Sequence, residues 1–152
     1  MSADTVVVAV TAVATAAVGG VFLAFSTFVM AGLARLPEGR GADAMRSINV
    51  TAVRVPFMIA FVGAALLSVA VVVLGFRSDD AAVRLLLILG GAAYLLGAFG
   101  LTIARNVPLN DALEASEGAT WPTYLRAWTA ANHVRTVTSL AASALLLVAL
   151  SR

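Results

Sequence analysis

The sequence contains no cysteine and no lysine, and only 12% of its 152 residues are charged. Without cysteine, the chain can form neither a disulfide framework nor a thiolate metal site. Because lysine is absent, the strongly basic side chains are all arginines, of which there are ten. They are scattered along the chain rather than gathered on one face, which argues against nucleic acid as a partner. What remains is strongly apolar, since 61% of the residues are hydrophobic, against about 45–50% in a typical soluble domain.

Four stretches between charged residues are long and apolar. They cover residues 5–34, 55–76, 85–104 and 136–151, which are 30, 22, 20 and 16 residues, and a membrane-spanning helix needs about 20. Hydrocarbon offers the backbone no hydrogen-bond partners, so each stretch must pair its own amides, as a helix does. We therefore predict an all-α, integral membrane four-helix bundle, formed by one domain over residues 1–152. Its spans are expected at about 5–33, 55–76, 85–104 and 134–151.

The segments between the spans carry their own helix signals. Residues 42–54 lack glycine and proline and lead into the second span. Thr120, Trp121 and Pro122 form a helix start ahead of the fourth span. We therefore expect helices two and four to extend beyond the membrane. Pro108 is expected to push Val107 out of helical geometry just after the third span.

The connections differ in length, which constrains the topology. Residues 77–84 form a tight turn, whereas the connections 34–54 and 105–135 are long and must lie on the same side of the membrane. The side of the long connections carries seven arginines and the other side carries three. The positive-inside rule then predicts a multi-pass protein of the cell membrane, with both termini outside and the long loops in the cytoplasm.

A polar and aromatic stripe runs along the fourth helix. When residues are placed at 100° steps, six of them fall within about 40° of one line: Trp121, Tyr124, Trp128, Asn132, Arg135 and Ser139. One interpretation is an aromatic belt at the membrane surface with a snorkelling arginine. The other is the wall of a pocket. Asn132 favours the pocket, because its short amide cannot snorkel and needs partners inside the bundle.

Arg135 supports the same interpretation. The apolar run that follows it spans about 24 Å as a helix, less than the roughly 30 Å of hydrocarbon, so Arg135 is drawn towards the membrane interior. We predict that its guanidinium points into the bundle beside Trp128, within hydrogen-bond reach of Asn49, Asn106 or Asn110. For Asn106 and Asn110, a role as helix caps explains the sequence equally well.

Other polar residues are expected to lie outside this site. Arg54 points away from Asn49 on the helical wheel, so we expect it to anchor in lipid headgroups. His133, the single histidine, faces away from the stripe near Arg126 and is expected at the surface. The acidic residues lack the Glu-x-x-His spacing of di-iron bundles, and one histidine cannot build a facial triad, so no metal and no cofactor are expected.

Several motifs together resemble those of the anthrone oxygenase family of small four-span membrane proteins. They are Gly-Gly-Val-Phe-Leu-Ala-Phe-Ser with Met-Ala-Gly-Leu (19–33), Ala-Met-Arg-Ser-Ile-Asn (44–49) before Pro56-Phe57, Asn-Val-Pro-Leu-Asn (106–110) and Trp-Thr-Ala-Ala-Asn-His-Val-Arg (128–135). The resemblance implies a four-helix membrane protein, and some members oxidise anthrones to anthraquinones without a recognised metal or flavin. By motif position it points to six residues: Asn49, Asn106, Asn110, Trp128, Asn132 and Arg135.

The expected function is a membrane-embedded oxygenase-like activity on an apolar anthrone-like or phenolic substrate, with dioxygen and without a metal. Arg135 would stabilise the developing oxyanion, with Asn132, Asn106 and Asn49 as the other catalytic candidates. Trp128, Tyr124 and Asn110 are the candidates for substrate binding. The alternative is a non-catalytic membrane module that binds a small hydrophobic ligand or a lipid, or packs against a partner subunit or a second copy of itself. A transporter is less favoured, because none of the four apolar stretches contains an Asp or Glu side chain.

Overall fold

The computed structural model describes residues 2–116 and 121–152, and within them every regular element is a helix. The first of four long rods contains α1 (Ala3–Ala24), the π-helical stretch η1 (Phe25–Val29) and α2 (Met30–Ala34). A separate helix, α3 (Arg40–Ala52), precedes the second rod, α4 (Val55–Arg77).

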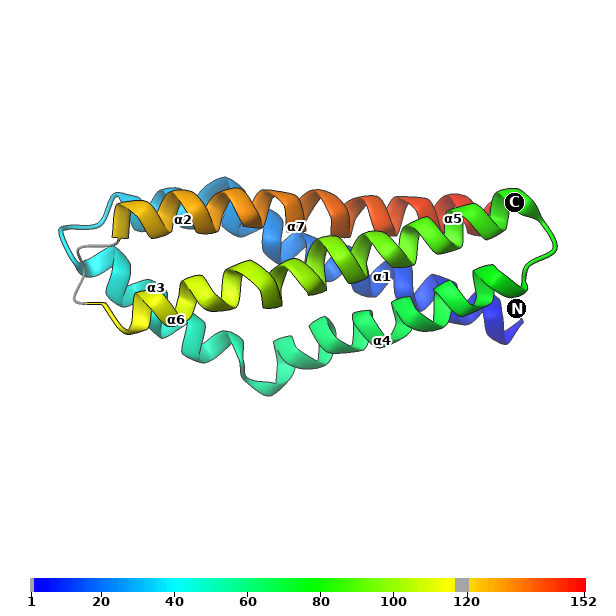
Figure 1. Ribbon diagram of the computed structural model, residues 1–152, viewed down its shortest axis with the longest axis horizontal. Coiled ribbons are helices and arrows are strands. Elements are labelled where there is room, and N and C mark those ends of the chain that lie inside the picture. The colour runs from blue at the N-terminus through cyan, green and yellow to red at the C-terminus, as the bar shows by residue number, and fades with distance from the viewer. Residues whose placement is uncertain (1, 117–120) are drawn as a thin grey trace.

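The third and fourth rods complete the bundle. The third contains α5 (Ala81–Ala92), the π-helical stretches η2 (Ala93–Gly100) and η3 (Thr102–Asn106), and α6 (Val107–Glu114). The fourth is one uninterrupted helix, α7 (Trp121–Leu150). Figure 1 shows the rods side by side, with both termini and the α4–α5 turn at one end, called here the terminal end. The other end, formed by α3, α6 and the start of α7, is called the loop end.

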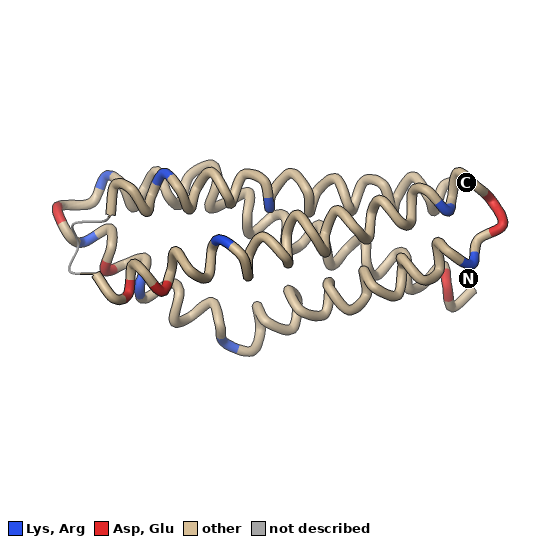
Figure 2. Tube along the Cα trace, viewed as in Figure 1, with Lys and Arg blue, Asp and Glu red and all other residues tan. Residues whose placement is uncertain are grey.

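All four rods are long and apolar enough to cross a membrane: Ala3–Ala34, Val55–Arg77, Ala81–Glu114 and Trp121–Leu150. The outer surface is apolar too, since Leu96 is 75% exposed and Phe76 is 70% exposed, and such a surface suits contact with lipid. Most charged residues lie towards the two ends of the bundle, and a few arginines lie nearer its middle (Figure 2). The prediction of an all-α, multi-pass membrane bundle is confirmed.

The bundle is held together along α7. α1 makes its largest interface with α7, and α5 and η2 pack on α7 from another side, while α4 lies mainly against α5 and α1. A central cluster of buried residues contains Phe22, Phe61 and Tyr94, and a second cluster at the loop end contains Met45 and Trp128. The polar stripe of α7 therefore faces the interior where these clusters adjoin.

The helix before the second span forms, but the expectation that it continues into that span is wrong. Arg54 is extended (φ −75°, ψ 159°), and α4 starts after it with Pro56 in its first turn. In a continuous helix the ring of Pro56 would clash with the carbonyl of Ala52, four residues earlier, and would leave that carbonyl without its donor. The first turn of a new helix is where a proline is tolerated.

The expectation for Pro108 is also wrong. Val107 keeps helical geometry (φ −63°, ψ −52°), and its N–H donates to the carbonyl of Thr102, five residues back. This wider π-helical turn carries the chain past the proline without a break. The third rod therefore continues to Glu114, beyond the predicted end of the span at residue 104.

The turn at the terminal end is set by local hydrogen bonds. The Asp80 carboxylate accepts from the backbone N–H of Val83 (3.0 Å) and Ala82 (2.8 Å), which caps α5 and holds the pKa of Asp80 below its usual value. Across the turn, the Arg84 guanidinium donates to the carbonyl of Ser78 at 2.7 and 3.1 Å. This turn closes the connection between α4 and α5.

Close packing of α4 on α5 depends on Gly91. A Cβ atom added to Gly91 would lie 2.7 Å from the backbone oxygen of Ser68 and 2.5 Å from a methyl group of Val72. The backbone oxygen cannot move without shifting α4. By contrast, a Cβ atom at Gly63, in the middle of α4, would meet nothing within 4 Å.

We therefore predict that Gly91→Ala destabilises the protein by about 1–3 kcal/mol, the usual cost of overpacking. Gly63→Ala is the matched control and should be neutral or slightly stabilising, because alanine is the better helix former. Thermal unfolding of both purified variants in the same detergent measures the difference. Equal stability of the two variants would contradict the packing argument.

Candidate functional site

Arg135 lies in the interior of the bundle. It is 4% exposed, and its guanidinium carbon sits 4.3 Å from the ring centre of Phe22 and 4.9 Å from that of Trp128. Nη1 donates to the Thr102 hydroxyl (3.1 Å), and Nη2 donates to Oδ1 of Asn132 (2.7 Å). Among the described residues, no carboxylate forms an ion pair with Arg135. A buried cation is thus held by neutral partners and by the faces of two aromatic rings.

Asn132 holds this cation in place. Its Nδ2 donates to the carbonyl of Phe22 (2.7 Å) and to the hydroxyl of Ser26 (2.8 Å), while its Oδ1 accepts from Arg135. The side chain is fully buried and uses both its amide nitrogen and its oxygen. Asn132 therefore links the first rod to α7 and fixes the position of the guanidinium.

The partners of α7 come from π-helical stretches on two sides. Ser26 lies in η1, and Thr102 and Asn106 lie in η3. A π-helical turn interrupts the regular i→i−4 ladder and is frequently found at functional sites. The two stretches present these short polar side chains to the stripe on α7.

Three polar atoms near Arg135 are buried without a hydrogen-bond partner in the described part of the chain. They are Oδ1 of Asn106, Nε1 of Trp128 and Nε of Arg135. Asn106 is 1% exposed, and its Nδ2 makes one long contact of 3.4 Å with the carbonyl of Trp128. Unpaired buried polar atoms are uncommon in native structures. Here two donors and one acceptor remain available to a bound molecule.

A second polar group lies towards the loop end. The Tyr124 hydroxyl donates to Oδ1 of Asn110 (2.9 Å), and Asn49 of α3 lies beside the same hydroxyl. The Tyr124 ring stacks on Trp121 with ring centres 5.7 Å apart and lies 6.4 Å from Trp128. The ring of Phe25 lies 5.6 Å from that of Trp128. An unbroken row of aromatic rings therefore leads from the loop end to Arg135.

The structure confirms part of the geometry predicted for Arg135 and corrects the rest. The guanidinium does point into the bundle beside Trp128. The expectation that it would reach Asn49, Asn106 or Asn110 is wrong, because it bonds to Asn132, one turn away on its own helix, and to Thr102. His133 is exposed, as predicted, and so is Arg54.

The family to which the chain belongs was identified by comparison with known proteins. The model of the family described as anthrone oxygenase matches residues 45–145, well over half of the chain. The chain belongs to this family. The comparison with curated proteins and the comparison with solved structures each found no match.

The part matched to the anthrone oxygenase family holds all seven predicted site residues, from Asn49 to Arg135. The match begins at residue 45, after the first rod, which supplies Phe22 and Ser26 to the site. The first rod therefore adds contacts that the family match does not cover.

Four contributors to the site were missed at the level of the sequence: Phe22, Phe25, Ser26 and Thr102. Serine and threonine in an apolar helix usually bond to the carbonyl one turn earlier, and Thr102 does donate to Ala98 in this way (2.8 Å). For Thr102 the available signal was spacing, because it lies four residues before Asn106 and hence on the same side of the helix. Phe22, Phe25 and Ser26 lie in the first quoted motif, which gave no role to any of them.

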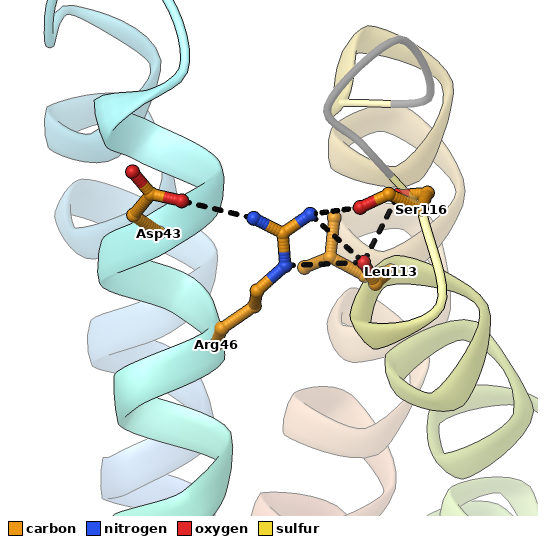
Figure 3. A network of polar contacts seen from close by, with 4 residues as sticks. All are labelled: Asp43, Arg46, Leu113 and Ser116. Atoms are coloured by element: carbon orange, nitrogen blue, oxygen red, sulfur yellow. Dashed lines mark hydrogen bonds and ion pairs between the residues drawn. The ribbon is translucent and has the colours of Figure 1, made fainter.

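Arg46 was counted with the arginines that determine topology, yet it joins two helices at the loop end (Figure 3). Its guanidinium donates to the carbonyl of Leu113 (3.1 and 3.2 Å) and to that of Ser116, and it pairs with Asp43 (2.9 Å). Leu113 lies in the last turn of α6 and Ser116 follows the end of this helix, where a cation is favoured. Arg46 thus fixes α3 against α6 next to the group around Tyr124.

Two hollows lie at the ends of the bundle, and Arg135 lines neither of them. One, of about 430 Å³, lies at the terminal end, and the other, of about 590 Å³, lies beside Pro37 and Arg40. Within residues 2–116 and 121–152, no three acidic or histidine side chains come together as a metal site would need.

The contacts of Asn132 lead to a prediction that contrasts it with its neighbour. Asn132→Ala should destabilise the protein by about 1–3 kcal/mol, because Arg135 and the Phe22 carbonyl lose their partner inside the bundle. His133→Ala is the matched control and should change stability by less than about 0.5 kcal/mol, as expected of an exposed position. Thermal unfolding in detergent tests the pair, and a larger loss for His133→Ala would contradict the assignment.

Proposed function

We propose that this chain is a membrane-embedded oxygenase-like protein that acts on an apolar anthrone-like or phenolic substrate with dioxygen, without a metal or an organic cofactor. The observation that carries the proposal is the buried guanidinium of Arg135, which has no carboxylate partner in the described residues. A cation that is desolvated without a counter-charge is costly in a membrane protein. The same cation stabilises an anion that forms beside it.

The reaction needs mainly an anion and the exclusion of water. Loss of a proton from the activated methylene of an anthrone gives an enolate. The enolate carbon forms a bond to dioxygen and is oxidised, and the resulting hydroperoxide loses water to leave a carbonyl. One dioxygen is consumed, one of its oxygens stays in the product and the other leaves as water. Removal of the first proton is the step that Arg135 would favour.

The surrounding residues have roles that follow from their contacts. Nε of Arg135 and Nε1 of Trp128 are donors without partners, and both could bind the enolate oxygen. Oδ1 of Asn106 is a free acceptor for a substrate hydroxyl. Asn132 acts as a positioning residue for Arg135. The rings of Trp128 and Tyr124 would lie against a flat aromatic substrate, and Asn49 and Asn110 would fix the Tyr124 hydroxyl.

Two features define what the proposal requires. Arg135 is 4% exposed, so an apolar substrate that enters from the lipid must separate the side chains around the guanidinium. His133 is exposed on another face of α7, so the proton acceptor is hydroxide rather than this imidazole. A rate that rises with pH follows from the second feature.

The alternative is a non-catalytic module in which the same polar residues serve packing. It is favoured by the bonds from Arg135 to Thr102 and Asn132, which already use two of its three nitrogens. Experiments can distinguish the two functions. A packing role predicts that replacing Arg135 unfolds the protein and that the wild-type protein consumes no oxygen.

We predict that the purified protein consumes oxygen with anthrones, hydroquinones or related phenols. Arg135→Lys should lower the rate by at least about 100-fold, because a compact ammonium cannot reproduce the planar donors that meet the oxyanion. The matched control is Arg126→Lys, an exposed arginine on the same helix, which should keep the wild-type rate. Oxygen-electrode traces are compared with the melting temperature of each variant.

Two results would contradict the oxygenase proposal. One is the absence of oxygen uptake by folded wild-type protein with each of these substrate classes. The other is an Arg135→Lys variant that keeps full activity. An Arg135→Lys variant that unfolds while the wild type shows no uptake would support the packing role instead.

We also propose the orientation predicted by the arginines. With Arg135 excluded because it is buried, six arginines remain on the side of the loop end and three on the side of the terminal end. The positive-inside rule then places the loop end in the cytoplasm and both termini outside.

The absence of cysteine makes this orientation simple to test. In intact cells, a membrane-impermeant maleimide should label Asp79→Cys in the turn of the terminal end and should not label Glu38→Cys at the loop end. Both positions are exposed, so permeabilised cells provide the control in which both variants react. The reverse pattern in intact cells would overturn the orientation.

A further inference from the structure

A cleft of about 430 Å³ lies at the terminal end, where all four rods converge. It is remote from the site around Arg135, and none of the residues discussed for that site lines it. Its volume falls within the range of about 300–1,000 Å³ that is typical of small-molecule sites. The proposal below does not depend on the oxygenase activity.

The lining of this terminal cleft has an apolar part and a charged part. The apolar part includes at least one side chain from each rod: Val8, Leu74, Val83, Leu87, Ala149 and Leu150. The charged part is formed by Asp4, Arg77 and Arg152. A surface that combines both kinds of side chain suits a molecule with a charged group and a hydrocarbon portion.

The three charged side chains are available to a ligand. Asp4, Arg77 and Arg152 form no hydrogen bond through their side chains and no ion pair within the described residues. Arg152 acts on Asp80 only through its longer-range charge. By contrast, the guanidinium of Arg84 in the same region already donates hydrogen bonds to the carbonyl of Ser78.

The cleft also lies at the depth where lipid headgroups are found. Asp4 is in the first turn of the first span, Arg77 ends the second span, and Arg152 follows the fourth. Just below them the outer surface is apolar, with Phe76 70% exposed and Val73 50% exposed. The acyl chains of a molecule seated in the cleft would therefore continue along lipid-facing side chains.

We propose that the terminal cleft binds the headgroup of a phospholipid that carries a primary amine, such as an ethanolamine phospholipid. The guanidinium groups of Arg77 and Arg152 bind the phosphate, for which two planar forks of donors are well suited. The Asp4 carboxylate accepts hydrogen bonds from the ammonium group. A choline headgroup lacks N–H donors and an unmodified glycerol headgroup lacks the cation, so both bind less tightly.

The test is native mass spectrometry of the full-length protein in detergent, titrated separately with phosphatidylethanolamine, phosphatidylcholine and phosphatidylglycerol of the same acyl chains. We expect the ethanolamine lipid to bind most tightly and the double variant Arg77→Ala/Arg152→Ala to lose at least about tenfold in affinity, since it loses both charge-assisted contacts. Asp4→Asn should remove the preference for ethanolamine over choline. Arg126→Ala, which removes one exposed arginine from the loop end, is the matched control and should bind as the wild type does.

Each opposing result has a distinct meaning. Equal affinity for the three lipids, or unchanged binding by the double variant, would overturn the site. A preference for ethanolamine that survives Asp4→Asn would overturn the role of the carboxylate. Free O-phosphoethanolamine that binds as tightly as the lipid would show that the ligand is a soluble phosphate ester, and the lipid assignment would fall. All these variants lie at exposed positions, and unchanged melting temperatures in the absence of lipid confirm their folding.

Discussion

A single positive charge inside a bundle of apolar helices constrains the centre of this protein. Arg135 cannot reach water, and no carboxylate in the described residues neutralises it. Its stability depends on neutral acceptors and ring faces supplied by neighbouring helices: Asn132 on its own helix, Thr102 from the third rod and Phe22 from the first. The mutual position of three rods is thereby tied to one guanidinium, because moving any of them would leave the charge without a contact.

The π-helical stretches make these contacts compatible with straight, closely packed rods. η1 carries Ser26 to Asn132, and η3 carries Thr102 and Asn106 towards α7 while it also accommodates Pro108. Each stretch changes the direction of a few side chains without ending the helix. In a membrane this matters more than in water, since a broken helix would expose backbone groups that hydrocarbon cannot satisfy.

The membrane bundle could be predicted from the sequence because charge-free length is a strong constraint in lipid. The stripe on α7 could be predicted as well, since Trp128, Asn132 and Arg135 lie on one continuous helix with a regular period. Contacts between rods could not. Thr102 gave no compositional sign of its role, and the shift of register in η3 has no marker in the sequence beyond a proline that was interpreted as a break. Arg46 shows the same limit, because an arginine at a membrane boundary has the same sequence context whether it contacts lipid or caps a neighbouring helix.

The interruption before α4 gives the second rod a fixed length. Its 23 residues extend about 34 Å along the helix axis, between an extended residue at one end and a tight turn at the other. The other three rods are longer, at 30 to 34 residues, and exceed a hydrocarbon core of about 30 Å by a wider margin. The second rod has the least excess length, and the backbone groups at both of its ends need water or headgroups. A membrane much thicker than this length would therefore strain the second rod, and its interface with α5, before the others.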